Sequence, residues 1–167
     1  MSTLSDPPSE GVLVVSADDP RSPEVVTLLD AHLRLMHALS PPQDVHALDL
    51  DGLTRPHVGF FSVRRDGELV AVGALAELGG GHVELKSMHT RSDLRRSGIA
   101  RLLVRHLLQE ARARGLSRVS LETGTQPEFA AARGLYAAEG FEVCGPFGGY
   151  VESAFSTFMT RRLPPER

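Results

Sequence analysis

The spacing of apolar residues changes after Thr90, and that change limits the folds this chain can adopt. Between residues 58 and 90 the apolar residues cluster in short runs of strand length. Beyond Thr90 they recur at intervals of three and four, on one face of a long helix that Gly115 ends: Ala100, Leu103, Val104, Leu107, Leu108 and Ala111. A further expected strand, 118–123, follows the helix. Because a strand–helix–strand unit normally forms a parallel pair with a right-handed crossover, we expect a mixed α/β domain.

Turn signals divide the remaining chain into further elements. Asp66-Gly67 is a strong hairpin signal, and Gly79-Gly80-Gly81 allows a second reversal, so we expect an antiparallel meander before Thr90. Pro23 stands near the start of a first helix that Ser40-Pro41-Pro42 ends. The expected strands are 12–15, 58–64, 68–78, 82–90, 118–123, 141–144 and 156–162. The expected helices are 24–39, 97–114 and 129–139, with one further helical turn within 43–57.

The composition is that of one ordinary globular domain. The 167 residues are 41% hydrophobic and 23% charged. We expect a single domain over 11–163 between flexible tails at 1–10 and 164–167. The first residues lack the basic and apolar regions of a signal peptide. No apolar run reaches the ~18 residues of a membrane span. The chain has a single cysteine, which excludes an internal disulfide framework. A cytoplasmic location without membrane association follows as an expectation.

Positive charge is concentrated in the middle of an acidic chain. The net charge is −3, yet residues 82–118 hold nine Lys and Arg against three Asp and Glu. This local excess favours a small anionic ligand over a polyanion. Arg105, Arg112 and Arg114 also fit a solvated helix face without a ligand. Nucleic-acid binding is disfavoured because the arginines are not interleaved with aromatic stacking platforms.

The segment Arg95-Arg96-Ser97-Gly98-Ile99-Ala100 lies between an expected strand and the long helix. The first turn of a helix has free N–H groups and the positive end of the helix dipole. Gly98 and the small Ala100 let a bulky anion approach those amides, so a pyrophosphate fits here beside the arginines. The other interpretation is an arginine-rich helix start without a ligand. The Lys-Ser/Thr ending of a nucleotide-triphosphatase loop and a G-x-G-x-x-G fingerprint are both missing.

These features together resemble the GNAT N-acetyltransferase superfamily. The R-x-x-G-x-A pattern after the strand ending at Thr90, followed later by Leu135–Phe141, is typical of it, and the resemblance covers about 58–162. More narrowly, several segments are similar to a bacterial YsnE-like subgroup: Glu84–Met88, Leu121–Thr125, Pro146-Phe147 with Tyr150, and Phe158–Thr160. The resemblance implies an α/β (α+β) fold, with a mixed, mostly antiparallel twisted sheet of six to seven strands, splayed in the middle and flanked by about four helices.

The resemblance also implies a cofactor and its contacts. Acetyl-CoA would be the acyl donor, without a metal ion. The strand ending at Thr90 would pair through its main chain with the pantetheine arm, and an N–H from Met88 would polarise the thioester carbonyl. The following turn would hold the pyrophosphate. The implied contact residues are Met88, His89, Thr90, Arg95, Arg96, Ser97, Gly98, Ile99, Ala100 and Arg101.

Two residues are implied as catalytic. Tyr136 falls at the position of the superfamily's general-acid tyrosine, which protonates the departing thiolate; taken alone, it also fits packing in an amphipathic helix. Glu84 is the candidate base, because an alkylammonium must lose a proton before it can attack. A Glu84–Lys86 surface pair without a catalytic role is the competing interpretation. Glu122 and His89 are further, weaker candidates for the base.

The expected acceptor is a primary amine, on a small molecule or a peptide, whose identity the sequence leaves open. Glu122, Phe147 and Tyr150 are the candidate pocket residues for it. No spacing of histidines and cysteines matches a metal site. We expect direct acetyl transfer in a ternary complex. A non-catalytic GNAT module that binds acyl-CoA as a sensor or binds a partner stays open beside the enzyme, as do monomeric and homodimeric states.

Overall fold

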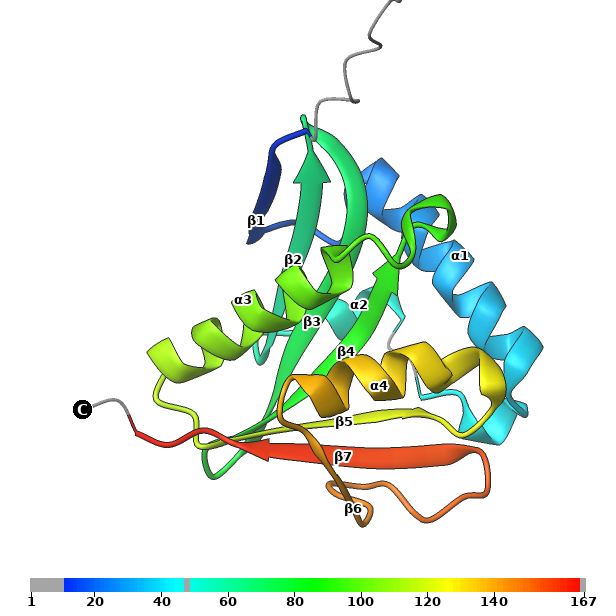
Figure 1. The fold of residues 1–167 in the computed structure, drawn as a ribbon, viewed down its shortest axis with the longest axis vertical. Coiled ribbons are helices and arrows are strands. Elements are labelled where there is room, and N and C mark those ends of the chain that lie inside the picture. Colours follow the sequence, from blue (N-terminus) through cyan, green and yellow to red (C-terminus); the bar gives the residue numbers. More distant parts are fainter. Residues whose placement is uncertain (1–10, 47–48, 166–167) are drawn as a thin grey trace, which may run out of the picture.

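The structure, a computed structural model, describes residues 11–46 and 49–165. A seven-stranded sheet forms its centre (Figure 1). The strands are β1 (Leu13–Ala17), β2 (Val58–Arg65), β3 (Glu68–Gly79), β4 (His82–Thr90), β5 (Arg118–Gly124), β6 (Glu142–Cys144) and β7 (Ser156–Arg162). The α-helices are α1 (Pro23–Leu39), α2 (Leu50–Leu53), α3 (Ile99–Ala113) and α4 (Ala130–Ala138), and the short 3-10 helices are η1 (Pro42–Asp44), η2 (Ser92–Leu94) and η3 (Pro127–Phe129).

The fold class expected from the sequence is confirmed. Every expected strand and helix is present, and their ends differ from the expected ones by two residues at most. The single domain over 11–163 and the two tails stay predictions, because residues 1–10 and 166–167 lie outside the described residues. Over 11–46 and 49–165, the helices are too short or too polar for any of them to cross a membrane.

The strands lie in the order β1-β2-β3-β4-β5-β7-β6. All neighbouring strands are antiparallel except β4 and β5, which are parallel, as the strand–helix–strand unit predicts. The turn between β2 and β3 has positive φ at both Asp66 (50°) and Gly67 (86°), the backbone that a two-residue hairpin requires. Strand β7 lies between β5 and β6, so the last strand of the chain is inserted within the sheet and the short β6 forms its edge.

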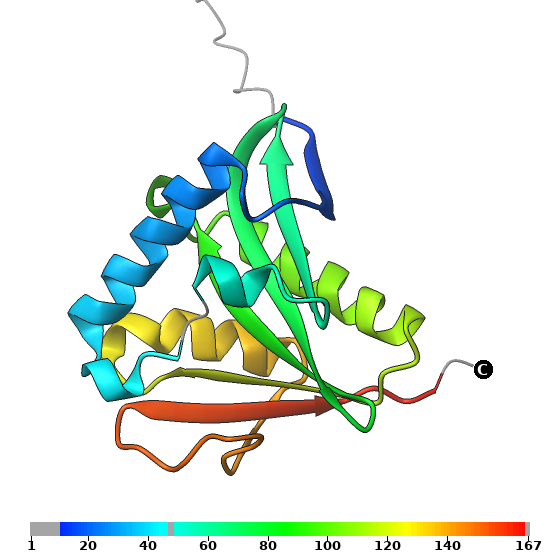
Figure 2. The ribbon, with the colours of Figure 1, turned by 180° about the vertical axis from the view of Figure 1, so that it is seen from behind.

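Helices cover both faces of the sheet, α3 and α4 one face and α1 and α2 the other (Figures 1 and 2). Two apolar clusters match these two faces. On α3, the residues at intervals of three and four that the sequence singled out are buried, and Leu103, Val104 and Leu107 have at most 1% of their surface exposed. Each such side chain contributes about 1.5–3 kcal/mol through burial, which fixes α3 against β3 and β4.

The sheet splits between β4 and β5. These strands pair only from His82 opposite Arg118 to Leu85 opposite Leu121, and then diverge (Figure 1). A β-bulge lies on β4 within this splay, because Ser87 and Met88 together stand opposite Gly73 of β3. Beyond Leu85 the edge of β4 that faces β5 has no strand partner in the described parts of the chain. The splay therefore presents free main-chain groups to whatever binds there.

The bulge requires a small residue at Gly73, on the opposite strand. A pair of glycine substitutions tests this requirement. A Cβ at Gly73 would lie 2.5 Å from Sδ of Met88 and 3.2 Å from Leu103, so we expect Gly73→Ala to lower the free energy of unfolding by about 1–3 kcal/mol. Gly134 lies within α4 with open space around it, so Gly134→Ala should raise that free energy by about 0.5–1 kcal/mol. Denaturant unfolding measures both. Equal effects of the two substitutions would contradict the close packing at Gly73.

Candidate active site

A pocket of about 140 Å³ opens at the splay. Five of the residues singled out in the sequence line it: Glu84, Met88, Glu122, Tyr136 and Tyr150. Strands β4 and β5 form its walls, α4 and the segment after α1 close two sides, and the loop between β6 and β7 supplies Tyr150. Residues from five separate parts of the sequence are thus brought to one cavity.

The turn before α3 presents main-chain donors. Arg96 and Gly98 both have positive φ (64° and 83°), and Gly98 occupies the position just before the helix. The first amide to donate within the helix is that of Leu102, which bonds the carbonyl of Gly98. The amides of residues 98–101 donate to no acceptor in the described chain, and no side chain caps the helix. A Cβ at Gly98 would meet nothing within 4 Å, so this end of α3 is open to a bulky anion.

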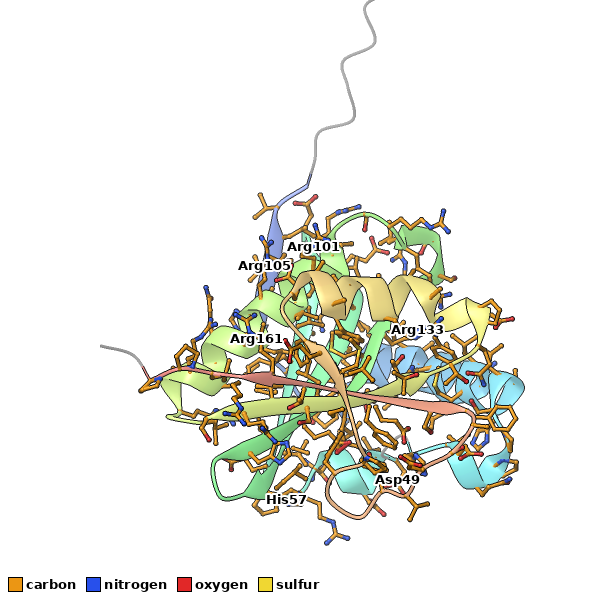
Figure 3. All side chains as sticks on the ribbon, turned by 60° about the horizontal axis from the view of Figure 1, so that its bottom comes forward. Asp49, His57, Arg101, Arg105, Arg133 and Arg161 are labelled. Carbon is orange, nitrogen blue, oxygen red and sulfur yellow. The ribbon has the colours of Figure 1, made fainter. Side chains whose placement is uncertain are left out.

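The arginines of this region divide into two groups. Arg95 and Arg96 are exposed and form no ion pair with any described residue. Arg101 instead lies 3.3 Å from Glu139, the residue that follows α4, and Arg105 lies 3.1 Å from the same carboxylate. Figure 3 shows Arg101 and Arg105 on α3 near Arg161 of β7, whose guanidinium donates to the main-chain carbonyl of Glu139. These contacts link α3 and β7 to the C-terminal end of α4, the helix that carries Tyr136.

Glu84 forms a buried network with two other side chains. Only 4% of its surface is exposed; its carboxylate accepts a hydrogen bond from the hydroxyl of Tyr150 and lies 3.3 Å from Nζ of Lys86. Lys86 in turn donates to the Tyr150 hydroxyl over 2.7 Å. Burial and the carboxylate of Glu84 raise the pKa of Tyr150 above its usual value. The Glu84–Lys86 pair does form, but it lies inside the pocket and not on the surface.

Glu122 pairs with a histidine from a distant segment. Its carboxylate lies within hydrogen-bond distance of Nδ1 of His46, which belongs to the segment after α1. The His46 ring also packs edge-on against Tyr150, with 4.9 Å between ring centroids. Burial holds the pKa of Glu122 above its usual value, against the opposing effect of His46. A carboxyl group with a raised pKa is well suited to exchange protons.

Tyr136 lies on α4 with its ring against Phe141, and 7% of its surface is exposed. Its hydroxyl has no hydrogen-bond partner among the described side chains, although the residue lines the pocket. Burial raises the pKa of Tyr136 to about 12. The phenol therefore carries its proton throughout the neutral range, as a general acid must.

Comparison with known proteins identifies the family. The model of the acetyltransferase (GNAT) family matches residues 25–141. The chain belongs to the GNAT acetyltransferase family. The uncharacterized N-acetyltransferase YsnE of Bacillus subtilis is 42% identical over 149 residues, 89% of this chain and 99% of that protein. An IAA acetyltransferase of Azospirillum brasilense is 37% identical over 90% of this chain and 98% of its own length. A solved structure from Klebsiella pneumoniae, 25% identical, superposes with a TM-score of 0.74 over 90% of this chain and 97% of that one.

This GNAT acetyltransferase is therefore an acetyl-CoA-dependent N-acetyltransferase, and the resemblance seen in its sequence is confirmed. The other expected site residues do not line the pocket: Thr90 ends β4, residues 95–101 form the turn and the first residues of α3, and Phe147 and His89 pack elsewhere. Phe147 packs edge-on against Tyr150, at 5.2 Å between centroids, and supports that ring without lining the pocket. His89 packs against His32 of α1, with 3.3 Å between their Nδ1 atoms.

Sequence reasoning missed His46, and it treated Lys86 only as a surface partner of Glu84. His46 lies in an irregular segment, where no spacing pattern ties it to Glu122 on β5. Lys86 gave a usable signal, since it shares a strand face with Glu84 by alternation. Among the described residues, no three His, Cys, Asp or Glu side chains are grouped so that they could hold a metal ion.

The His32–His89 pair in this GNAT acetyltransferase gives a pH prediction. Burial lowers the pKa of both imidazoles to about 4, and Arg95 adds to the effect. A folded-state pKa below the unfolded value of about 6.5 means that stability is present above pH 6.5 and is lost as pH falls toward 4. At pH 5 His32 alone should account for a loss of about 2 kcal/mol in the free energy of unfolding.

The measurement is denaturant unfolding of the wild type and His32→Gln at pH 7.5 and pH 5. The drop between the two pH values should be about 2 kcal/mol smaller in the variant. His37→Gln, on the exposed side of the same helix, is the control and should keep the wild-type drop. An equal drop in all three proteins would show that His32 is not held neutral by the fold.

Proposed function

We propose that this enzyme transfers the acetyl group of acetyl-CoA to a primary amine by direct attack within a ternary complex. One observation carries the proposal: a single pocket at the β4–β5 splay contains a protonated phenol, Tyr136, a buried carboxylate, Glu84, and a half-buried carboxylate, Glu122. The reaction needs a group that gives a proton to sulfur and a group that takes one from nitrogen. Both kinds of group face the same cavity.

The donor is held mainly by main-chain groups. The amides at the start of α3 would bind the pyrophosphate, with Arg95 and Arg96 beside it and Arg101 reaching from the first helical turn. The free edge of β4 from Met88 to Thr90 would pair with the pantetheine arm. The contact set is then Met88, His89, Thr90, Arg95, Arg96, Ser97, Gly98, Ile99, Ala100 and Arg101. Within it, His89 contributes its main chain, because its ring is engaged with His32.

Two residues, Glu84 and Tyr136, carry out the proton transfers of the proposed reaction. Glu84, acting through a water molecule, accepts a proton from the ammonium, and Lys86 and Tyr150 hold its carboxylate in place. The free amine then attacks, so a carbon–nitrogen bond forms and the carbon–sulfur bond breaks. Tyr136 gives its proton to the departing sulfur and regains one from solvent. Glu84 passes its first proton to solvent and then accepts the second proton of the nitrogen through the same water. Met88 contributes its N–H to the carbonyl oxygen.

The acceptor is an amine on a small molecule or a peptide, bound between Glu122 and the ring of Tyr150, with Phe147 supporting that ring. Three acidic residues line the pocket, Asp44, Glu84 and Glu122, and Lys86 lines it as well. The acidic residues therefore outnumber this lysine. Such a lining attracts a cation, and an amine is cationic before it reacts. The protein acts as a monomer or a homodimer in this proposal.

The test combines calorimetry with acetyl-CoA and a thiol-release assay over a diverse panel of amines. We expect saturable binding of acetyl-CoA and amine-dependent release of free CoA with at least one member of the panel. Initial rates that vary with both substrates should give intersecting double-reciprocal lines, the pattern of a ternary complex. Binding without release across a broad panel would support a non-catalytic acyl-CoA sensor in place of the enzyme, and parallel lines would contradict direct attack.

A further inference from the structure

Ser87, at the bulge of β4, combines two features that each oppose folding. Its φ is 56°, in the left-handed region that non-glycine residues rarely adopt. Its hydroxyl is buried and has no hydrogen-bond partner among the described residues, and 7% of the residue is exposed. A buried hydroxyl without a partner loses its bonds to water and gains nothing in return. Such outliers persist mainly where function requires them.

The position of Ser87 points to that function. It lines the pocket between Lys86 of the acidic network and Met88, whose N–H faces the splay in the proposed reaction. It also follows closely on Leu85, the last residue of β4 that pairs with β5. Ser87 therefore lies where β4 separates from β5, between the acidic network and Met88.

The neighbouring residues indicate which ligand atom the Ser87 hydroxyl would bind. The pocket is rich in hydrogen-bond acceptors, because Glu84, Glu122 and Asp44 all line it. An amine can therefore be bound without the serine. The two other donors singled out in the pocket have other roles: the ammonium of Lys86 is engaged with Glu84 and Tyr150, and the proposed reaction assigns the hydroxyl of Tyr136 to the departing sulfur. The carbonyl oxygen of the acyl group, which gains negative charge as the amine attacks, is the group that still needs donors.

We propose that the Ser87 hydroxyl donates a hydrogen bond to the acyl oxygen of bound acetyl-CoA, beside the N–H of Met88, and stabilises the charge that develops there. This inference rests on the proposed acetyl transfer. A hydroxyl that bonds no other described group does not have to give up a hydrogen bond when charge appears on the acyl oxygen, which favours stabilisation of that charge. The strained backbone of the bulge then has a role, because it directs two donors from adjacent residues toward one oxygen.

The kinetic test compares Ser87→Ala with the wild type in the thiol-release assay, using the best amine of the panel. We expect kcat to fall about 10²-fold with little change in KM for either substrate, because the bond strengthens in the transition state. Ser87→Gly also removes the hydroxyl and relaxes the backbone, so it should lose the same activity while its Tm is no lower than that of the wild type. Ser62→Ala removes a buried hydroxyl that is bonded to Asp18 outside the pocket, and should lower Tm but leave kcat unchanged.

A spectroscopic test needs no acceptor. Infrared difference spectra of acetyl-CoA labelled with ¹³C at the thioester carbonyl report its hydrogen bonding when it is bound. The carbonyl stretch should lie at lower frequency on the wild type than on Ser87→Ala or Ser87→Gly. Equal frequencies in all three would overturn the proposal, and so would a Ser87→Gly variant with full activity.

The two tests separate this inference from the function on which it rests. If no amine supports thiol release but the carbonyl shift depends on Ser87, the hydrogen bond is established and the catalytic reaction is wrong. If the wild type turns over and Ser87→Ala does so equally well, the acetyl transfer is supported and the role of Ser87 is excluded. A change confined to the KM of the amine would place the hydroxyl on the acceptor and contradict the proposal.

Discussion

Replacement of Tyr136 by phenylalanine is expected to lower kcat by ~10²-fold or more while the affinity for acetyl-CoA changes little. The ring packs against Phe141, and the hydroxyl bonds no described side chain, so the variant should fold with nearly unchanged stability. What it loses is the proton for the departing thiolate. Thiol release under saturating substrates gives kcat, and calorimetry gives the affinity.

The leaving group supplies a control for this variant. An acetyl thioester of a more acidic thiol needs less protonation as it leaves, so the deficit of Tyr136→Phe should shrink with such a donor. Tyr150→Phe, which removes the only other tyrosine hydroxyl, should show no such dependence, because that hydroxyl bonds Glu84 and Lys86. Full activity of Tyr136→Phe with acetyl-CoA would remove Tyr136 from the mechanism.

The second large effect is expected at Gly98, where an aspartate should weaken acetyl-CoA binding about 10²-fold. A carboxylate about 5 Å from the pyrophosphate adds a repulsion of about 3 kcal/mol at an effective dielectric constant of about 20. Aspartate tolerates positive φ better than most residues, and a Cβ at this position meets no protein atom within 4 Å. Calorimetry measures the affinity, and thermal unfolding checks the fold.

Two matched variants isolate the charge. Gly98→Asn has nearly the same shape without the charge, so it should bind acetyl-CoA much more tightly than Gly98→Asp. Gly115→Asp places aspartate at a comparable φ of 74° beyond the opposite end of α3, where a Cβ also meets nothing within 4 Å, and should leave affinity unchanged. Equal affinities of the aspartate and asparagine variants at Gly98 would show that no phosphate lies near this residue.

The sequence was most informative where a local pattern decides the structure. The apolar period of α3 and the Asp66-Gly67 turn depend on neighbouring residues only, and both formed as expected. The insertion of β7 between β5 and β6 is different, because strand order depends on which edges meet after the chain has collapsed. The bulge at Ser87 was also beyond the sequence, since it arises from the register between β3 and β4 and from the space that Gly73 leaves for Met88.

The candidate site divides in the same way. The turn around Gly98 could be placed because glycine, small residues and a helix start are a local signal. Tyr136 and Glu84 came from the family resemblance, and the structure brings both to one pocket. His46 carried no signal, because its contact with Glu122 spans 76 positions of the chain and joins an irregular segment to a strand. Long-range pairs of polar side chains leave no periodicity in a sequence.

A crystal structure of the protein with bound acetyl-CoA tests the central claim most directly. We expect pyrophosphate oxygens within about 2.7–3.2 Å of the amide nitrogens of residues 98–101, and the thioester carbonyl within the β4–β5 splay near Met88. A pyrophosphate bound elsewhere on the protein, or an acyl group that lies outside the splay and away from Tyr136, would contradict the account.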